Sequence, residues 1–262
     1  MDLGRWIPSN RFLYSTYERR LRRQLDLSRL PSHVAVLADG NRRWARTNAP
    51  GKPLVEGYLA GARKLEDFVG WCEELHIPVV TLWVLSTDNL QRADDEELGP
   101  LLQVIDGLVS RLANTGRHHV KVVGALDLLP PDVAASLHES EVVSKDNTGM
   151  HINVAVSYGG RQELRDAVRE LLADEAAKGS SLTELAENLE IDQIAEHLYT
   201  RGQPDPDLII RTSGEQRLSG FLMWQSAHSE FYFCEALWPD FRRVDFFRAL
   251  RSYAQRERRF GK

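Results

Sequence analysis

A short polar segment follows the first strongly apolar run of the chain and has the composition of a loop that binds anions and metal ions. It reads Asp39-Gly40-Asn41-Arg42-Arg43-Trp44. A carboxylate at Asp39 could hold Mg²⁺, which bridges diphosphate oxygens, and the two arginines could neutralise a diphosphate. A glycine after a buried strand permits a sharp turn, and a helix that begins behind it presents free N–H groups. The same segment also fits an ordinary strand-to-helix turn with solvated arginines.

A second polar segment follows the next apolar run and reads Ser86-Thr87-Asp88-Asn89-Leu90-Gln91-Arg92. Small polar groups and an arginine again gather where a strand should end, although Ser86 could equally cap the following helix. The acids Asp94, Asp95, Glu96 and Glu97 come next. We expect these acids in the first turn of that helix, where carboxylates stabilise the helix dipole, rather than in a metal-binding motif.

A third segment near the C-terminal end combines two arginines with a serine. Arg211 ends an apolar run, and Arg217, Leu218 and Ser219 follow shortly after it. Guanidinium groups grip phosphate oxygens in pairs, so this segment could clamp a second phosphate group.

The elements that position these segments are short apolar runs separated by longer segments, several of which have helical period. The runs are His33–Ala38, Val79–Leu85, His119–Val123, Ile152–Ser157, Leu208–Ile210 and Phe231–Phe233. Continuous apolar runs are typical of strands buried on both faces of a parallel sheet. We therefore predict a single-domain α/β fold with a mainly parallel sheet of about six strands covered by helices. Such sheets bind ligands at the carboxyl ends of their strands.

Composition limits the class of protein. The chain has 262 residues and a net charge of −5, which argues against a nucleic-acid partner, and arginine supplies 27 of its 33 basic residues. Two distant cysteines and the lack of a long apolar stretch favour a cytoplasmic protein. Residues 1–30 carry seven arginines and read as a basic helical arm before a catalytic domain over residues 31–262. This arm could contact the inner face of a membrane or pack on its own domain.

Taken together, these segments resemble the signature regions of the undecaprenyl diphosphate synthases, or cis-prenyltransferases. The resemblance runs from about His33 to Gly261, and its strongest parts are the segment at Asp39–Trp44 and the stretch from Arg211 to Trp224. It is nearest to the short-chain Z,E-farnesyl diphosphate synthases. The resemblance implies Mg²⁺ as cofactor, isopentenyl diphosphate and an allylic diphosphate as substrates, and a homodimer.

The resemblance also implies roles for individual residues. Asp39 and Glu230 would be the metal carboxylates, and Asp39 and Asn89 would be catalytic. The allylic diphosphate would be held by Gly40, Asn41, Arg42 and Arg43, with Trp44 packed beneath them and Tyr58 nearby. Ser86, Thr87, Asp88 and Arg92 would contribute to substrate binding, as would Arg211, Arg217, Leu218 and Ser219 for isopentenyl diphosphate. Arg259 and Gly261 match a terminal motif that reaches across the dimer to a diphosphate.

The chain departs from the pattern of long-chain members at several positions. Those enzymes usually have an arginine where Leu54 stands, a histidine where Tyr58 stands and a tryptophan where Leu90 stands, and often an alanine in place of Val84. Each added isoprene unit gains roughly 4 kcal/mol from burying five carbons in an apolar tunnel, so a wall must stop growth. Val84, Leu85 and Leu90 are candidates for that wall, although they could equally be ordinary core residues. We expect a short product, with geranyl diphosphate as primer and Z,E-farnesyl diphosphate as product.

Three alternatives stay open at this point. The chain could be a long-chain polyprenyl diphosphate synthase or a non-catalytic partner subunit of the same fold. Partner subunits typically lose the loop aspartate and arginines, which are present here. A nucleotide-binding enzyme is disfavoured because neither a Gly-x-x-x-x-Gly-Lys-Ser/Thr nor a Gly-x-Gly-x-x-Gly run occurs.

Overall fold

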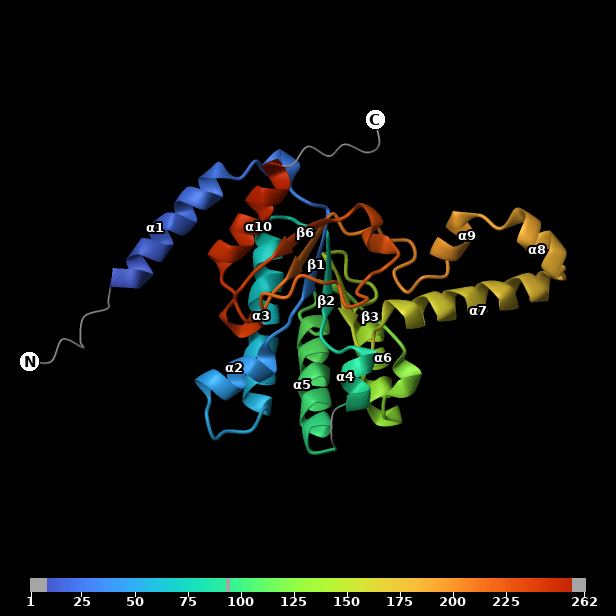
Figure 1. Ribbon diagram of the computed structural model, residues 1–262, viewed down its shortest axis with the longest axis horizontal. Coiled ribbons are helices and arrows are strands. Elements are labelled where there is room, and N and C mark those ends of the chain that lie inside the picture. Colours follow the sequence, from blue (N-terminus) through green and yellow to red (C-terminus); the bar gives the residue numbers. More distant parts are fainter. Residues whose placement is uncertain (1–8, 93–94, 256–262) are drawn as a thin grey trace, which may run out of the picture.

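A parallel sheet forms the centre of the molecule (Figure 1). The computed structural model describes residues 9–92 and 95–255, with side chains over 17–91 and 96–255. The strands are β1 His33–Leu37, β2 Val79–Trp83, β3 His119–Val123, β4 His151–Ala155, β5 Leu208–Arg211 and β6 Glu230–Phe233. Their order across the sheet is β3-β4-β2-β1-β5-β6, and every pair is parallel. The predicted single α/β domain with a six-stranded parallel sheet is confirmed.

Helices connect and cover the strands (Figure 1). The α-helices are α1 Ser9–Gln24, α2 Asn41–Asn48, α3 Val55–Glu74, α4 Thr87–Arg92, α5 Asp95–Ala113, α6 Pro131–Ser144, α7 Gly160–Lys178, α8 Leu182–Asn188, α9 Ile191–Ala195 and α10 Arg243–Gln255. Short 3₁₀ helices are η1 Leu27–Arg29, η2 Leu126–Leu128, η3 Gln225–His228 and η4 Trp238–Asp240.

The two faces of the sheet bury different amounts of apolar surface. Alternate strand residues point to opposite faces. On one face, Val36 and Leu82 join a large core with Phe68 of α3, Leu108 of α5 and Phe246 of α10. On the other face, a smaller cluster combines residues such as Ala35, Leu37 and Ala155 with Phe221 and Leu222 of the segment after β5. All five residues of β1 are buried, which explains why its sequence is a continuous apolar run.

The apolar residues Leu164, Val168, Leu171 and Leu172 recur with helical period in α7, but this stripe is only partly buried. Leu171 is 4% exposed, whereas Val168 and Leu172 are each 41% exposed. The reason is that α7 extends away from the sheet and continues into α8 and α9 at the edge of the molecule (Figure 1). Its period reflects a helix, but the sheet covers only its beginning.

Within the N-terminal arm, the described helix α1 packs on α10 of the same chain. Leu21 is 1% exposed, and the guanidinium of Arg248 lies 5.2 Å from the centre of the Tyr17 ring. Of the two alternatives for the arm, the structure shows intramolecular packing, and membrane contact stays a prediction. Among the described residues, no helix is both long and apolar enough to cross a membrane.

Candidate active site

Four neighbouring strands bring their carboxyl ends to one edge of the sheet. The central order β4-β2-β1-β5 places Asp39 after β1 next to Ser86 after β2 on one side and Arg211 at the end of β5 on the other. An isolated bridge between Ser86 and Tyr158 draws the segment after β4 to the same place. The segments around residues 39, 86, 158 and 211 are far apart in the sequence. They lie side by side because parallel strands end at the same edge of the sheet.

A cavity of about 950 Å³ lies at this edge. It is lined by residues from all four strand ends, among them Trp83, Tyr158 and Met223. The predicted site residues in its lining are Asp39, Ser86, Thr87, Asp88, Asn89, Arg211, Arg217, Leu218 and Ser219. Ser86 also caps α4, because its Oγ accepts a hydrogen bond from the backbone N–H of Asn89 at 3.0 Å. Capping therefore fixes the position of Asn89 at the cavity wall.

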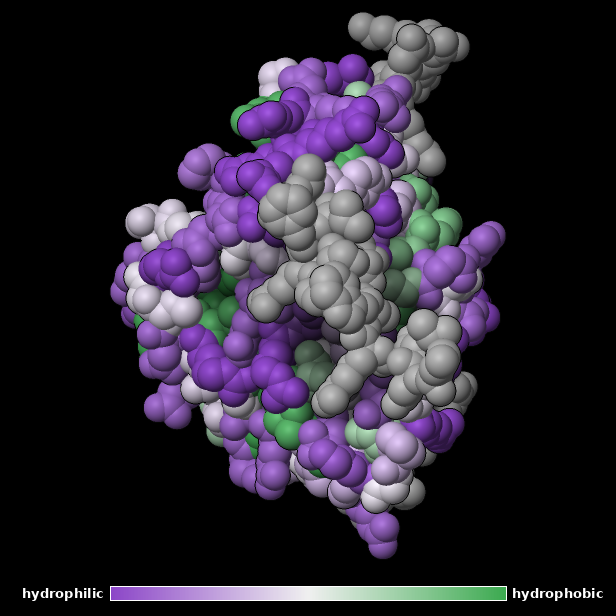
Figure 2. All heavy atoms as spheres, turned by 90° about the vertical axis from the view of Figure 1, so that its left-hand side faces the viewer, coloured by the Kyte–Doolittle hydropathy of each residue, from purple (hydrophilic) through white to green (hydrophobic). Residues whose placement is uncertain are grey.

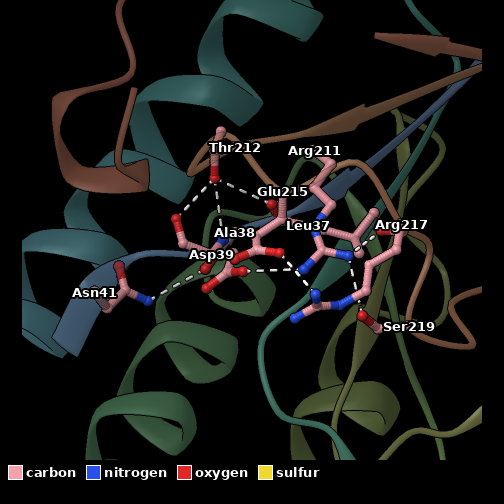
Figure 3. A network of polar contacts seen from close by, with 9 residues as sticks. All are labelled: Leu37, Ala38, Asp39, Asn41, Arg211, Thr212, Glu215, Arg217 and Ser219. Atoms are coloured by element: carbon pink, nitrogen blue, oxygen red, sulfur yellow. Dashed lines mark hydrogen bonds and ion pairs between the residues drawn. The ribbon is translucent and has the colours of Figure 1, made fainter. Parts of the chain in front are cut away.

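Arg211 organises the wall between this cavity and the loop after β1 (Figure 3). One terminal nitrogen, Nη2, lies 3.2 Å from Asp39 Oδ2, while Nη1 donates to Ser219 Oγ at 3.0 Å and to the carbonyl of Arg217. Only 5% of the Arg211 side chain is exposed, and its Nε has no hydrogen-bond partner among the described residues. Ser219 adopts a left-handed φ of 51°, so the turn that carries its hydroxyl is strained.

Thr212 fixes the end of β1 against β5 in the same network. Its Oγ1 lies 3.2 and 2.8 Å from the carbonyl oxygens of Leu37 and Asp39, which share its one hydrogen as acceptors, and it accepts from the Asp39 N–H at 3.1 Å. These contacts hold the Asp39 backbone in place while 42% of its side chain stays exposed.

A second cavity of about 320 Å³ lies on the other side of Asp39, at the N-terminal end of α2. Its lining includes the predicted residues Gly40, Asn41, Arg42, Arg43 and Tyr58, and the chain-length candidates Val84 and Leu85. Three arginines of α2 face it, Arg42, Arg43 and Arg46, together with the free N–H groups that begin a helix. Both features favour an anion.

Two glycines allow α2 to begin where it does. Gly40 has φ = 111°, and a Cβ there would lie 3.1 Å from the Leu237 backbone. A Cβ at Gly57 of α3 would lie 2.2 Å from the carbonyl oxygen of Asn41. Any larger residue at either position would push the start of α2 away from its neighbours.

The two cavities share part of their walls, and this is the central geometric feature of the site. Asp39, Asn89, Ala38 and Val84 line both cavities. Two anionic ligands could therefore be held side by side, with one carboxylate and one carboxamide between them.

The structure also shows cavity residues that the sequence patterns did not single out. Gly159, Gly160, Arg161 and Gln162 line the larger cavity at the start of α7. They follow an apolar strand directly, so the rule that ligands meet strand ends would have found them. Glu97, which the sequence predicts only as a helix-dipole carboxylate, also forms an ion pair with Arg42 at 2.8 Å. No local pattern reveals that contact, because it joins α2 to α5.

Several predicted residues lie elsewhere. Glu230 begins β6 and pairs with Leu208 at the start of β5, at the opposite edge of the sheet from Asp39, so the structure does not bring these two carboxylates together.

Trp44 supports α2, since its Nε1 donates to Asp240 at 2.8 Å, and lines neither cavity. Leu90 packs against the main core. The Arg92 side chain and residues Arg259 and Gly261 lie outside the part of the chain that the structure describes.

The donor set fits Mg²⁺ as a partner of diphosphate. Mg²⁺ is usually bound through one or two carboxylates together with phosphate oxygens and waters. Asp39 supplies an exposed carboxylate at the wall that both cavities share. No group of three or more His, Cys, Asp or Glu side chains forms a metal cluster within the described residues.

The fold and the site therefore have the features of an α/β protein with a parallel sheet, in which two arginine-lined cavities lie on either side of one carboxylate and suit two anionic ligands. Residues 37–261 match the family model described as "Putative undecaprenyl diphosphate synthase". The chain is 60% identical to a (2Z,6E)-farnesyl diphosphate synthase of Thermobifida fusca, over 95% of this chain and 97% of that protein. It is 54% identical to isoprenyl transferase 1 of Streptomyces avermitilis, over 96% of each.

A solved structure agrees with these relatives. The crystal structure of lavandulyl diphosphate synthase from Lavandula x intermedia, in complex with dimethylallyl diphosphate, superposes with a TM-score of 0.81. It shares 32% sequence identity and covers 90% of this chain and 100% of its own. The chain belongs to the undecaprenyl diphosphate synthase family, the cis-prenyltransferases, and the predicted family and enzyme class are confirmed.

Proposed function

We propose that this enzyme condenses isopentenyl diphosphate with an allylic diphosphate, in a Mg²⁺-dependent reaction, to give a short Z-prenyl diphosphate. Among the allylic diphosphates we favour geranyl diphosphate as the primer, and Z,E-farnesyl diphosphate as the product. The observation that carries this proposal is the pair of cavities that meet at Asp39 and Asn89. The similarity to a (2Z,6E)-farnesyl diphosphate synthase supports the short product.

The smaller cavity suits the allylic diphosphate. In the reaction, the C1–O bond of the primer breaks and the diphosphate leaves with the bonding electrons. Arg42, Arg43 and the first N–H groups of α2 would stabilise this developing negative charge as fixed donors. Asp39 is the residue that would hold Mg²⁺, which would supply further positive charge for the departing diphosphate.

The larger cavity suits isopentenyl diphosphate. Arg211, Arg217 and Ser219 would hold its diphosphate so that its terminal double bond faces C1 of the primer. The π electrons of that double bond then form the new C–C bond. Holding the two carbons in contact is the main contribution of the shared wall, since proximity alone lowers such barriers by several kcal/mol.

A proton must then leave C2 of the isopentenyl unit to form the new Z double bond. Asn89 lies in the shared wall, but a neutral carboxamide is a poor base at pH 7. We infer that Asn89 orients a water or relays the proton toward Asp39 or the released diphosphate. Full activity of Asn89→Asp with a new acid limb in its pH–rate profile would contradict a purely orienting role.

The chain-length argument rests on the apolar end of the smaller cavity. Val84, Leu85 and Leu101 contribute its apolar lining, and Leu85 and Leu101 are buried. We expect Val84→Ala to lengthen the product because it removes two methyl groups from this wall. Leu90→Ala is the matched control, since Leu90 lines neither cavity. An elongated tunnel beyond this wall stays a prediction.

The test is an incorporation assay with labelled isopentenyl diphosphate and, separately, dimethylallyl, geranyl and E,E-farnesyl diphosphate, with and without Mg²⁺. Chromatography reads product length and double-bond geometry. A single short Z product from geranyl diphosphate supports the proposal. A ladder dominated by ten or more isoprene units would keep the family and refute the short product.

Asp39→Asn tests the role of the shared carboxylate. The carboxamide keeps the shape of the side chain but loses the charge that would hold Mg²⁺ and pair with Arg211. We expect turnover to fall by about a hundredfold to a thousandfold, comparable to the loss of a main electrostatic group. Circular dichroism should be unchanged, and near-normal turnover would contradict the assignment.

A further inference from the structure

At the wall of the smaller cavity, three side chains from three helices form a compact polar cluster. Arg42 of α2 uses its Nε to contact both Tyr58 Oη of α3, at 2.9 Å, and Glu97 Oε1 of α5, at 2.8 Å. The Tyr58 hydroxyl donates to the same Glu97 oxygen. Burial raises the pKa of Tyr58 to about 12, so its hydroxyl keeps its proton near neutral pH.

The members of this cluster differ in their position relative to the cavity. Arg42 and Tyr58 line it, whereas Glu97 does not. The Glu97 side chain is 15% exposed, compared with 37% for Arg42. Glu97 thus contacts Arg42 from outside the cavity lining, at the Nε edge of the guanidinium.

The way Arg42 is held leaves its phosphate-binding groups available. Among the described residues, its hydrogen bonds and ion pair all involve Nε. Both terminal amino groups therefore remain for a ligand in the cavity. An unsupported arginine side chain samples many rotamers, and fixing one edge of the planar guanidinium reduces the entropy lost when the other edge binds.

We propose that Glu97 is a positioning residue for the allylic substrate: it orients the Arg42 guanidinium, with Tyr58, so that its terminal N–H groups face the allylic diphosphate. This inference rests on the proposed function of the smaller cavity. A negative charge behind an anion site also repels the anion. The direct contact at 2.8 Å makes positioning the larger effect, because Glu97 pairs with Arg42 rather than facing the ligand.

The experiment compares Glu97→Ala with Glu96→Ala. Glu96 is its exposed neighbour in the same first turn of α5, so both variants lose the same charge near the same helix end. Binding of geranyl thiodiphosphate, an allylic analogue that does not ionise readily, and of isopentenyl diphosphate is measured by calorimetry. Steady-state KM values for geranyl and isopentenyl diphosphate accompany them.

We expect Glu97→Ala to raise the analogue Kd and the primer KM about fivefold to tenfold, a fraction of what loss of a charged hydrogen bond costs. The Kd of isopentenyl diphosphate should change less than twofold, and Glu96→Ala should leave every constant unchanged. In an Arg42→Ala background, adding Glu97→Ala should cause no further loss of primer affinity. A purely structural role for Glu97 would not produce that non-additivity.

The outcomes separate the two proposals. A wild-type enzyme that binds neither the analogue nor isopentenyl diphosphate would overturn the proposed function, and this inference with it. A wild-type enzyme that binds both, with Glu97→Ala binding the analogue equally well or more tightly, would overturn this inference alone. Equal losses for both ligands, or a full further loss in the Arg42→Ala background, would also overturn it.

Discussion

At the scale of single residues, the candidate site depends on arginines whose guanidinium groups are held in place by neighbouring side chains. Arg211 divides its terminal nitrogens between Asp39 on one side and the Arg217–Ser219 turn on the other. Arg42 is held through Nε by Glu97 and Tyr58. A planar, multidentate guanidinium can hold a wall and face a ligand at once, which a lysine ammonium cannot do.

This geometry predicts the effect of Arg211→Lys. A single ammonium cannot contact both Asp39 and Ser219 from the same buried position. We expect the KM of isopentenyl diphosphate to rise at least tenfold, in line with the loss of one hydrogen bond to a charged group. Arg201→Lys, at an exposed ion pair with Glu170, is the control and should behave as wild type. A raised KM for the primer alone would assign Arg211 to the wrong substrate.

At the scale of elements, the position of the beginning of α2 depends on the close approach of the segment around Leu237 and of α3 at Gly57. The chain turns at Gly40 with a left-handed φ and passes within contact of Leu237. This turn sets where the first N–H groups of α2 point.

Gly40→Ala should therefore affect stability and primer binding together. We expect the free energy of unfolding to fall by about 1–3 kcal/mol, from backbone strain and from the clash with Leu237. Gly51→Ala is a matched control, since Gly51 also has a positive φ, 78°, but nothing lies within 4 Å of a Cβ there. It should cost about 1 kcal/mol and leave the primer KM unchanged. Urea unfolding and steady-state kinetics measure both, and equal losses would contradict the role of close approach.

The opposite edge of the sheet contains a buried histidine that ties three segments together. His33 of β1 contacts Thr81 of β2 through Nε2 at 2.8 Å and the carbonyl of Pro204 through Nδ1 at 2.7 Å. Burial lowers the pKa of His33 to about 4. In the unfolded chain the pKa of a histidine is about 6.5.

Between these two pKa values the unfolded state binds the additional proton, so stability falls as the pH falls from about 6.5 to 4. The full loss is on the order of 3 kcal/mol. Urea unfolding at pH 7.0, 5.5 and 4.5 should show this loss, and His33→Gln should flatten that part of the pH profile. His138→Gln, at a histidine whose side chain is 74% exposed, should leave the profile unchanged. A His33→Gln profile as steep as wild type would assign the acid sensitivity elsewhere.

At the scale of the whole molecule, the basic N-terminal segment is part of the folded domain as far as it is described. The described helix α1 lies against α10, and Arg243 of α10 reaches Glu18 at 3.5 Å. On the side of the molecule where α1 lies, the left-hand side of Figure 1, the part of the surface that is coloured is predominantly hydrophilic (Figure 2). Cytoplasmic location, a homodimer and contact with a membrane remain predictions from composition and resemblance.

The packing of α1 predicts a measurable contribution to stability. Leu21 is 1% exposed, so Leu21→Ala should lower the free energy of unfolding by about 2–5 kcal/mol. Leu27→Ala, at a residue 64% exposed a short distance further along the chain, should change it by less than about 0.5 kcal/mol. If Leu21→Ala is as stable as wild type, α1 is not a cooperative part of the domain.

The class of fold and the edge of the sheet where the candidate site lies both follow from the order and character of the apolar runs in the sequence. Strands buried on both faces are continuous apolar runs, and the predicted runs match the strands to within two residues at every end. Parallel strands end at one edge, so the positions of Asp39, Asn89 and Arg211 behind their apolar runs are enough to group them. The same rule places Glu230 at the other edge, because it begins a strand rather than ending one.

The side chains that meet across helices, in contrast, become known only when the packing of the helices is known. The contact of Arg42 with Glu97 depends on how α2, α3 and α5 pack, and the local sequence around Glu97 indicates only a helix that begins there. The exposure of Val168 and Leu172 likewise depends on where the sheet stops covering α7. Local patterns encode period and burial along one element, whereas contacts between elements depend on distances that emerge only when the whole domain is packed.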